Sequence, residues 1–116
     1  MSIQRIEPGA RMGKAVVHGD TVYLAGIVAD AAKGKSVTEQ TRDILGQIDG
    51  LLAKAGSDKS KVLTATIYIT DMANFAEMNA VWDKWVSAGN TPARATVEAA
   101  LAAADYKVEI MVVAAK

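Results

Sequence analysis

Two charged residues near the C-terminus lie in runs that are otherwise small or apolar. Arg94 lies in the run Asn90–Glu98, and if this run is a strand, Arg94, Thr96 and Glu98 share one face because side chains alternate. Glu109 is the one carboxylate of the apolar run 106–114, where a buried charge is costly unless it is paired. A guanidinium fork suits a carboxylate ligand, and a carboxylate can take a proton from water. Two plainer interpretations stay open, a solvated surface arginine and a structural Arg–Glu pair.

Composition excludes several kinds of function. The 116 residues predict a single domain, 1–116, and the 13 basic and 13 acidic residues give no net charge and no dense basic cluster, so nucleic-acid binding has no support. The chain has no cysteine, and a single histidine, His18, cannot build a metal centre. No apolar run resembles a signal peptide or a membrane span, so we expect a cytoplasmic protein with no membrane partner.

The first half of the chain predicts strands followed by a helix. A short strand at 3–6 precedes a hairpin of residues 14–18 and 21–25, joined by a Gly-Asp turn beside His18. Ser36 and Glu39 form a capping box that begins a helix, whose apolar stripe ends at Gly56. Gly46 and Gly50 lie inside this helix, and we interpret them as positions of close packing against a sheet.

The second half adds a central strand, a helix and two further strands. The run 61–70 is β-branched and apolar on both faces, with Leu63, Ala65, Ile67 and Ile69 on one of them. Asp71 can cap a second helix with the apolar stripe Phe75, Met78, Trp82 and Trp85. Strands are expected at 93–99 and 106–114, whereas 98–105 could be helical by propensity. The order predicts an α+β sandwich: a mixed sheet of about six strands with both helices on one face, and a partner subunit covering the other face.

Several stretches, in order, resemble the Rid family, the reactive intermediate deaminases also called YjgF-like or endoribonuclease L-PSP-like proteins. They are the first hairpin (Ala15–Gly26), Glu39–Arg42, Ala55–Ser57, Val62–Met72, Phe75–Asn79, and the two most specific motifs, Pro92–Val97 and Lys107–Ile110. The resemblance covers essentially the whole chain. It implies a chorismate-mutase-like fold, and a homotrimer whose sheets form a central barrel with clefts at the subunit interfaces.

The resemblance also implies an activity and roles for residues. Members hydrolyse enamine or imine acids such as 2-aminoacrylate, released by pyridoxal-phosphate enzymes, to 2-oxo acids and ammonia, without a metal or organic cofactor. Arg94 matches the family arginine that would bind the substrate carboxylate, with a backbone N–H near Thr96 as a second donor. Glu109 matches the glutamate that would orient and deprotonate water. We expect the two residues on different strands that could lie side by side.

The chain departs from the family pattern around this pair. Met12 stands where a tyrosine helps to close the cleft, Ala25 replaces a serine before Gly26, Ile27 replaces a glutamine, and Thr96 replaces a cysteine. These changes indicate a subgroup other than the main aminoacrylate-clearing one, with an altered pocket wall.

Two alternatives to catalysis remain. The altered wall is compatible with a non-catalytic trimer that binds a 2-oxo acid or a protein. A ribonuclease, which the older family name suggests, is disfavoured by the zero net charge and the lack of a histidine pair.

Overall fold

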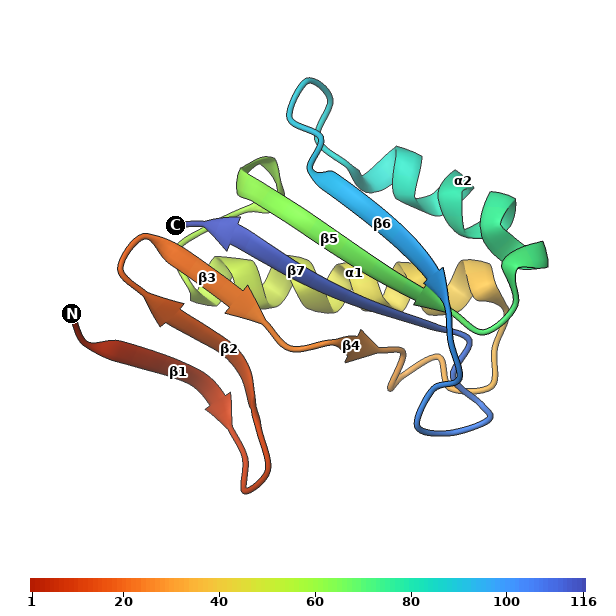
Figure 1. The fold of residues 1–116 in the computed structure, drawn as a ribbon, viewed down its shortest axis with the longest axis horizontal. Helices are drawn as coiled ribbons and strands as arrows, with labels where there is room; N and C mark the ends of the chain where they lie inside the picture. The colour runs from red at the N-terminus through yellow and green to blue at the C-terminus, as the bar shows by residue number, and fades with distance from the viewer.

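A computed structural model describes all residues, 1–116, as one sheet with two helices (Figure 1). Its elements are β1 (Ile3–Pro8), β2 (Gly13–His18), β3 (Thr21–Leu24), β4 (Ile27–Val28), α1 (Val37–Lys54), β5 (Val62–Ile69), α2 (Phe75–Trp85), β6 (Ala93–Glu98) and β7 (Val108–Ala115). Short 3₁₀ turns at Lys59–Lys61 and Met72–Asn74 precede β5 and α2. Residues 99–107 form neither helix nor strand, so the alanine-rich propensity for helix is not realised there.

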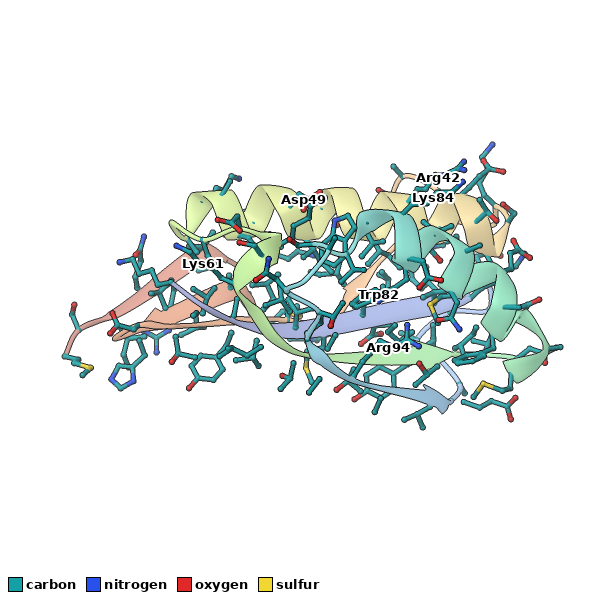
Figure 2. The ribbon with its side chains drawn as sticks, turned by 90° about the horizontal axis from the view of Figure 1, so that it is seen from above. Arg42, Asp49, Lys61, Trp82, Lys84 and Arg94 are labelled. Atoms are coloured by element: carbon teal, nitrogen blue, oxygen red, sulfur yellow. The ribbon has the colours of Figure 1, made fainter.

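The strands form a mixed sheet in the order β1-β2-β3-β7-β5-β6, with β4 pairing β7. All pairings are antiparallel except β5 with β6. Seen along the sheet, both helices lie on one side of it (Figure 2). The predicted α+β architecture is therefore confirmed, with the short β4 as a strand that the sequence did not indicate.

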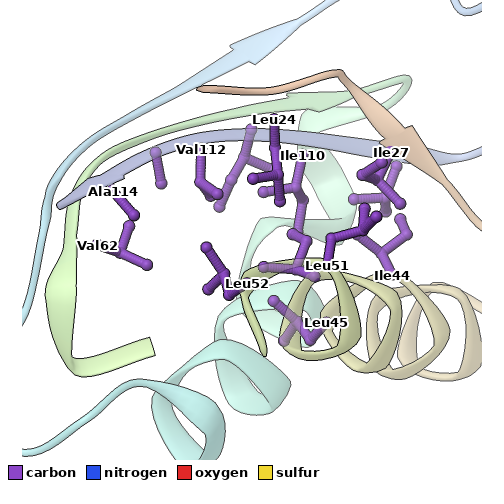
Figure 3. Packing of buried hydrophobic residues seen from close by; sticks show 14 of the residues in the cluster. Leu24, Ile27, Ile44, Leu45, Leu51, Leu52, Val62, Ile110, Val112 and Ala114 are labelled. Carbon is purple, nitrogen blue, oxygen red and sulfur yellow. The ribbon is translucent and has the colours of Figure 1, made fainter. Parts of the chain in front are cut away.

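The core lies between the helices and the sheet (Figure 3). Alternate residues of β7 are buried against the helix layer: Val108, Ile110, Val112 and Ala114. The apolar stripe of α1 covers them, with Ile44, Leu45, Ile48, Leu51 and Leu52 buried. The alternation in the strand and the helical spacing in α1 were both predicted from the sequence. Burial of these apolar side chains is the main force that holds the helices on the sheet.

Helix α1 begins as predicted, but its two internal glycines face solvent and not the sheet. Ser36 Oγ accepts a hydrogen bond from Glu39 N–H at 3.1 Å, and the helix is followed by Gly56 at φ +81°. Gly46 and Gly50 are exposed, and a Cβ atom built on either meets no atom within 4 Å. The expected close packing is wrong. Each glycine lies two residues from Ile48, about 200° around the helix, and so faces away from the sheet.

Strand β5 carries one irregularity that changes which residues are buried. The register shifts between Val62 and Thr64, so Val62 is buried and Leu63 is 51% exposed. A β-bulge inserts one residue and reverses the alternation beyond it. The expected placement of Leu63 with Ala65, Ile67 and Ile69 is therefore wrong, and the other three are buried as predicted.

The second helix differs from expectation at its start. Asp71 accepts a hydrogen bond from Ala73 N–H and caps the 3₁₀ turn, and α2 itself begins at Phe75. Met78 and Trp82 are buried, whereas Phe75 is exposed. Neither helix is long and apolar enough to span a membrane.

Gln40 connects α1 to the start of β7. Its side chain is fully buried, Nε2 donates to the carbonyls of Lys35 and Asp105, and Oε1 accepts from Lys107 N–H at 2.9 Å. These three bonds join α1 to the residue before its N-cap and to the loop that leads into β7, where the Asp105 carbonyl also accepts from Gly34 N–H. They also hold the residue that leads into Glu109.

We expect Gln40→Leu to lower the free energy of unfolding by about 1–3 kcal/mol, because it removes three part-buried hydrogen bonds from a fully buried side chain to the backbone. Urea denaturation measures this as a lower midpoint at an unchanged slope. The matched control is Gln4→Leu on β1, where the glutamine is exposed and makes no side-chain hydrogen bond. Equal midpoints for Gln40→Leu and Gln4→Leu would show that the three bonds contribute nothing.

Glu77, in the first turn of α2, caps the N-terminus of α1. Its Oε2 accepts from Thr38 N–H at 2.9 Å and from Thr38 Oγ1 at 2.8 Å. These hydrogen bonds, led by the one from the Thr38 hydroxyl, hold the pKa of Glu77 below its ordinary value of 4.5. Because the folded pKa is depressed, the stabilisation is present above pH 4.5 and is lost as pH falls through the folded value.

Glu77→Gln is therefore expected to lower the melting temperature near neutral pH, with the difference from wild type vanishing in acid below the folded pKa. Thermal denaturation followed by circular dichroism across this pH range measures the difference. Asp83→Asn, an exposed carboxylate of α2 without a hydrogen bond, is the control. A constant difference at all pH values would rule out the ionised cap.

Candidate functional site

Arg94 lies on the helix-covered face of β6. It pairs in register with buried Ala65 of β5, and paired residues of parallel strands point to the same side. Its guanidinium carbon lies 5.3 Å from the centroid of the Trp82 ring and 5.9 Å from that of Phe75, so the group sits beneath α2 (Figure 2). Both distances are in the range of cation–π attraction. The half-buried guanidinium has no carboxylate partner and donates no hydrogen bond within the chain.

Two buried polar atoms beside this strand and helix also lack partners. Thr96 Oγ1, on the same face of β6 as Arg94, and Asn79 Oδ1 of α2 are the buried side-chain polar atoms without a hydrogen bond. Buried polar groups are normally satisfied, so atoms of this kind indicate a place where a ligand or water binds. With the Arg94 donors they form a polar edge between β6 and α2, in which Thr96 Oγ1 can donate or accept and Asn79 Oδ1 accepts.

Asn79 is a candidate site residue that the sequence analysis did not single out. It stands four residues after Phe75 and three before Trp82, within the stripe of α2 that faces Arg94. A polar residue inside an apolar helical stripe was the signal that could have identified it.

Glu109 lies on the opposite face of the sheet. It pairs with Tyr68 of β5 and Val28 of β4, whereas its neighbours Val108 and Ile110 point into the core. Its carboxylate rests on Gly26, where a Cβ atom would overlap Glu109 Oε2. Ala25 and Gly26 connect β3 to β4, so this connection forms the floor on which the carboxylate lies.

The expectation that Arg94 and Glu109 lie side by side is wrong within one chain. Strand β5 runs between β6 and β7, and the two side chains point to opposite faces of the sheet. The only ion pair in the chain is Lys54–Glu7, at 2.7 Å. The alternative of a structural Arg94–Glu109 pair is therefore also excluded within one chain.

The remaining predicted wall residues are dispersed. Met12, in the β1–β2 connection, is 47% exposed and belongs to the edge of the sheet opposite β6. Ile27 is 1% exposed and pairs with buried Ile110, so it is part of the core and not of a pocket wall. The structure places Ala25 and Gly26 near Glu109, Thr96 near Arg94, and Met12 near neither.

The sheet face that carries Glu109 is largely apolar and uncovered. Tyr23 of β3, Met111 of β7 and Val97 of β6 are large exposed side chains on it. An uncovered apolar sheet face is characteristic of a surface that binds another protein chain. No group of three or more acidic or histidine side chains lies close enough together to hold a metal ion.

These features define a small α+β protein in which one sheet carries an unpartnered arginine on one face and a carboxylate on the other. The sequence model of the family described as endoribonuclease L-PSP matches residues 2–116. The chain is 47% identical to a RutC family protein of Haemophilus influenzae, covering 98% of each chain. It is 46% identical to the RutC family protein YoaB of Escherichia coli, covering 99% of each.

Solved structures give the same assignment. A member of the YjgF protein family from Neisseria meningitidis superposes with a TM-score of 0.96 at 47% identity, over 100% of this chain and 96% of that one. A Rid family protein of unknown function from Yersinia pestis gives a TM-score of 0.91 at 28% identity, over 99% and 100%. The chain belongs to the Rid family, also described as YjgF-like or endoribonuclease L-PSP.

Proposed function

We propose that the protein hydrolyses small 2-imino or enamine acids to 2-oxo acids and ammonia, acting in the cytoplasm as a homotrimer. Membership of the Rid family supports this general role. The observation that carries it is the Arg94 guanidinium, which is half-buried and without an anionic partner although unsatisfied Thr96 and Asn79 atoms lie on the adjoining surfaces. A small carboxylate supplies the charge and the acceptors that such a donor lacks.

In the proposed binding step, Arg94 holds the substrate carboxylate by two parallel N–H···O bonds. The rings of Trp82 and Phe75 restrict the guanidinium from the α2 side, so less conformational freedom is lost on binding. A backbone N–H near Thr96 is a further donor to the same carboxylate. Because the carboxylate is held at these donors, the imine carbon next to it lies at a fixed distance from strand β6.

In the proposed chemical step, Glu109 takes a proton from a water molecule as the water oxygen bonds to the imine carbon. The electrons of the C=N double bond pass to the nitrogen, which takes up a proton from solvent, giving a tetrahedral carbinolamine. Glu109 then returns its proton to this nitrogen as the C–N bond breaks and ammonia leaves, and the hydroxyl proton passes to solvent as the C=O bond of the 2-oxo acid forms. A carboxylate positioned as a general base contributes about 10²–10⁴-fold to such a step.

The two halves of the proposed site come from different chains. Arg94 and Glu109 cannot converge within one chain because they lie on opposite faces of one sheet. A cyclic trimer would bring the Arg94 edge of one copy against the apolar Glu109 face of the next, burying Tyr23, Met111 and Val97. We also propose that Met12, in the β1–β2 hairpin, lines the cleft at the position of the family tyrosine. This replacement would distinguish a separate subgroup of the family.

A coupled assay tests the proposal. An L-amino acid oxidase generates 2-imino acids in situ, and the rate of 2-oxo acid formation is followed with and without the protein, after circular dichroism has shown that it is folded. We expect acceleration for at least one small 2-imino acid. Unchanged rates across a series of side chains would overturn the catalytic role.

A second candidate function is binding of a 2-oxo acid without turnover. It is favoured by the separation of Arg94 from Glu109, because the arginine half can bind a carboxylate without the base. In that case a 2-oxo acid raises the melting temperature through Arg94, and no imine is consumed.

A further inference from the structure

A groove between α1 and α2 lies on the outer side of the helix layer, away from the sheet. Its volume is about 380 Å³, within the range of small-molecule sites. Residues from both helices line it: Arg42, Gly46 and Asp49 from α1, and Glu77, Lys84 and Trp85 from α2. None of them belongs to the Arg94 or Glu109 halves of the proposed catalytic site.

The two acidic residues of the groove already have partners in the fold. Glu77 accepts both hydrogen bonds from Thr38. Asp49 accepts from Trp85 Nε1–H, at 3.0 Å to Oδ1 and 3.1 Å to Oδ2. Both carboxylates are thereby used to join α1 to α2.

The two basic residues have no partners. Arg42 of α1 and Lys84 of α2 make neither an ion pair nor a side-chain hydrogen bond, although they line the same groove. The carboxylates of Asp49 and Glu77 keep their charge, because their hydrogen-bond partners are neutral. The attraction of an anion therefore rests on hydrogen bonds from Arg42 and Lys84 and not on a net positive charge of the groove. Arg42 can hold such an anion with a planar fork, and Lys84 adds a point charge.

The floor of the groove is apolar and open. Leu45, Val81 and the Trp85 ring line it, and Gly46 leaves space that a side chain would otherwise occupy. A glycine inside a helix costs up to about 1 kcal/mol relative to alanine. Close packing does not explain a glycine at position 46, whereas a groove that must stay open above it does.

We propose that this groove binds a small organic anion, a carboxylate attached to an apolar body of about one ring. Arg42 and Lys84 hold the charged end, and the body lies over Gly46 against Leu45 and Trp85. The site is separate from the interfacial one, because it faces away from the sheet and uses neither Arg94 nor Glu109.

Titration with benzoate tests this inference, with the Trp85 indole N–H signal in ¹H–¹⁵N NMR spectra as the reporter, since that group lies in the groove. The titration uses the wild-type chain and is repeated with Arg94→Gln, which removes carboxylate binding at the other site. Benzyl alcohol supplies the body without the charge, and inorganic phosphate supplies charge without the body.

We expect a saturable shift with benzoate in both chains and weaker binding of both other probes. Arg42→Gln and Gly46→Leu are expected to weaken benzoate binding at least about tenfold, because one removes a charged hydrogen bond and the other fills the groove. Gly50→Leu is the matched control. It is an exposed glycine of the same helix with open space around it but outside the groove, and it should bind as wild type does.

Three results of the titration with the wild-type and Arg94→Gln chains would overturn the inference. They are the absence of a saturable shift in wild type, a shift that disappears with Arg94→Gln alone, and phosphate binding as tightly as benzoate. Equal affinities of the Gly46→Leu and Gly50→Leu variants would also reject the groove as the site, since both place the same side chain on the same helix.

Discussion

Glu109→Gln is expected to lower kcat for 2-imino acid hydrolysis by about 10²–10⁴-fold, the usual contribution of a general base. Glutamine has nearly the same shape and can still accept a hydrogen bond, but it cannot take the proton from water. Binding of the 2-oxo acid product should change little, because in the proposed site the carboxylate binds to Arg94. Steady-state kinetics in the oxidase-coupled assay and a separate product-binding titration measure the two quantities.

The same carboxylate can be displaced without changing its chemistry. Gly26→Ala places a Cβ atom far inside contact distance of Glu109 Oε2, so the Glu109 side chain must move. We expect kcat to fall, as it does for Glu109→Gln, by an amount that depends on how far the Glu109 side chain moves. Gly50→Ala, at a glycine with open space, is the control and should leave kcat unchanged. Full activity of both Glu109→Gln and Gly26→Ala would show that Glu109 is not the base.

Arg94→Ala is expected to lower kcat/KM by about 10²–10³-fold, because it removes the two charge-assisted hydrogen bonds proposed to hold the substrate carboxylate. Arg94→Lys keeps the charge and loses the planar fork, so we expect its kcat/KM to lie between those of the wild type and Arg94→Ala. The stabilisation of the folded protein by a 2-oxo acid should disappear with Arg94→Ala, which thermal denaturation measures directly.

The control for Arg94→Ala addresses folding. The guanidinium lies over Trp82 and Phe75, so its removal also loses packing beneath α2. Urea denaturation of each variant separates this loss from the loss of binding. Arg5→Ala, at an exposed arginine of β1, should preserve both kcat/KM and the ligand-induced shift. Wild-type kcat/KM in a folded Arg94→Ala variant would remove the arginine from the site.

The layers of this fold were predictable because their residues alternate with clear periods. The buried set of β7 and the α1 stripe follow periods of 2 and 3.6, and the capping box at Ser36 set the start of α1. The face that Arg94 shares with Thr96 and Glu98 followed from the same alternation and is confirmed by its register with β5.

The relation between strands was less accessible from the sequence. Alternation shows which residues of β6 share a face, but not which face is covered by helices. That depends on the parallel pairing of β6 with β5, which places β5 between Arg94 and Glu109. The bulge at Leu63 and the outward direction of Gly46 likewise arise from register and helix rotation. The candidate pair was therefore found by residue type, whereas its division between two faces required the structure.

Subunit complementation tests the central claim most directly. Arg94→Ala and Glu109→Gln chains, each inactive alone, are unfolded, mixed in equal amounts and refolded together. If each site takes its arginine from one chain and its glutamate from the next, random assembly leaves about a quarter of the sites intact, and about a quarter of wild-type activity returns. Activity that stays at the level of the separate variants, in assemblies shown to contain both chains, would contradict a site built between two copies of the protein.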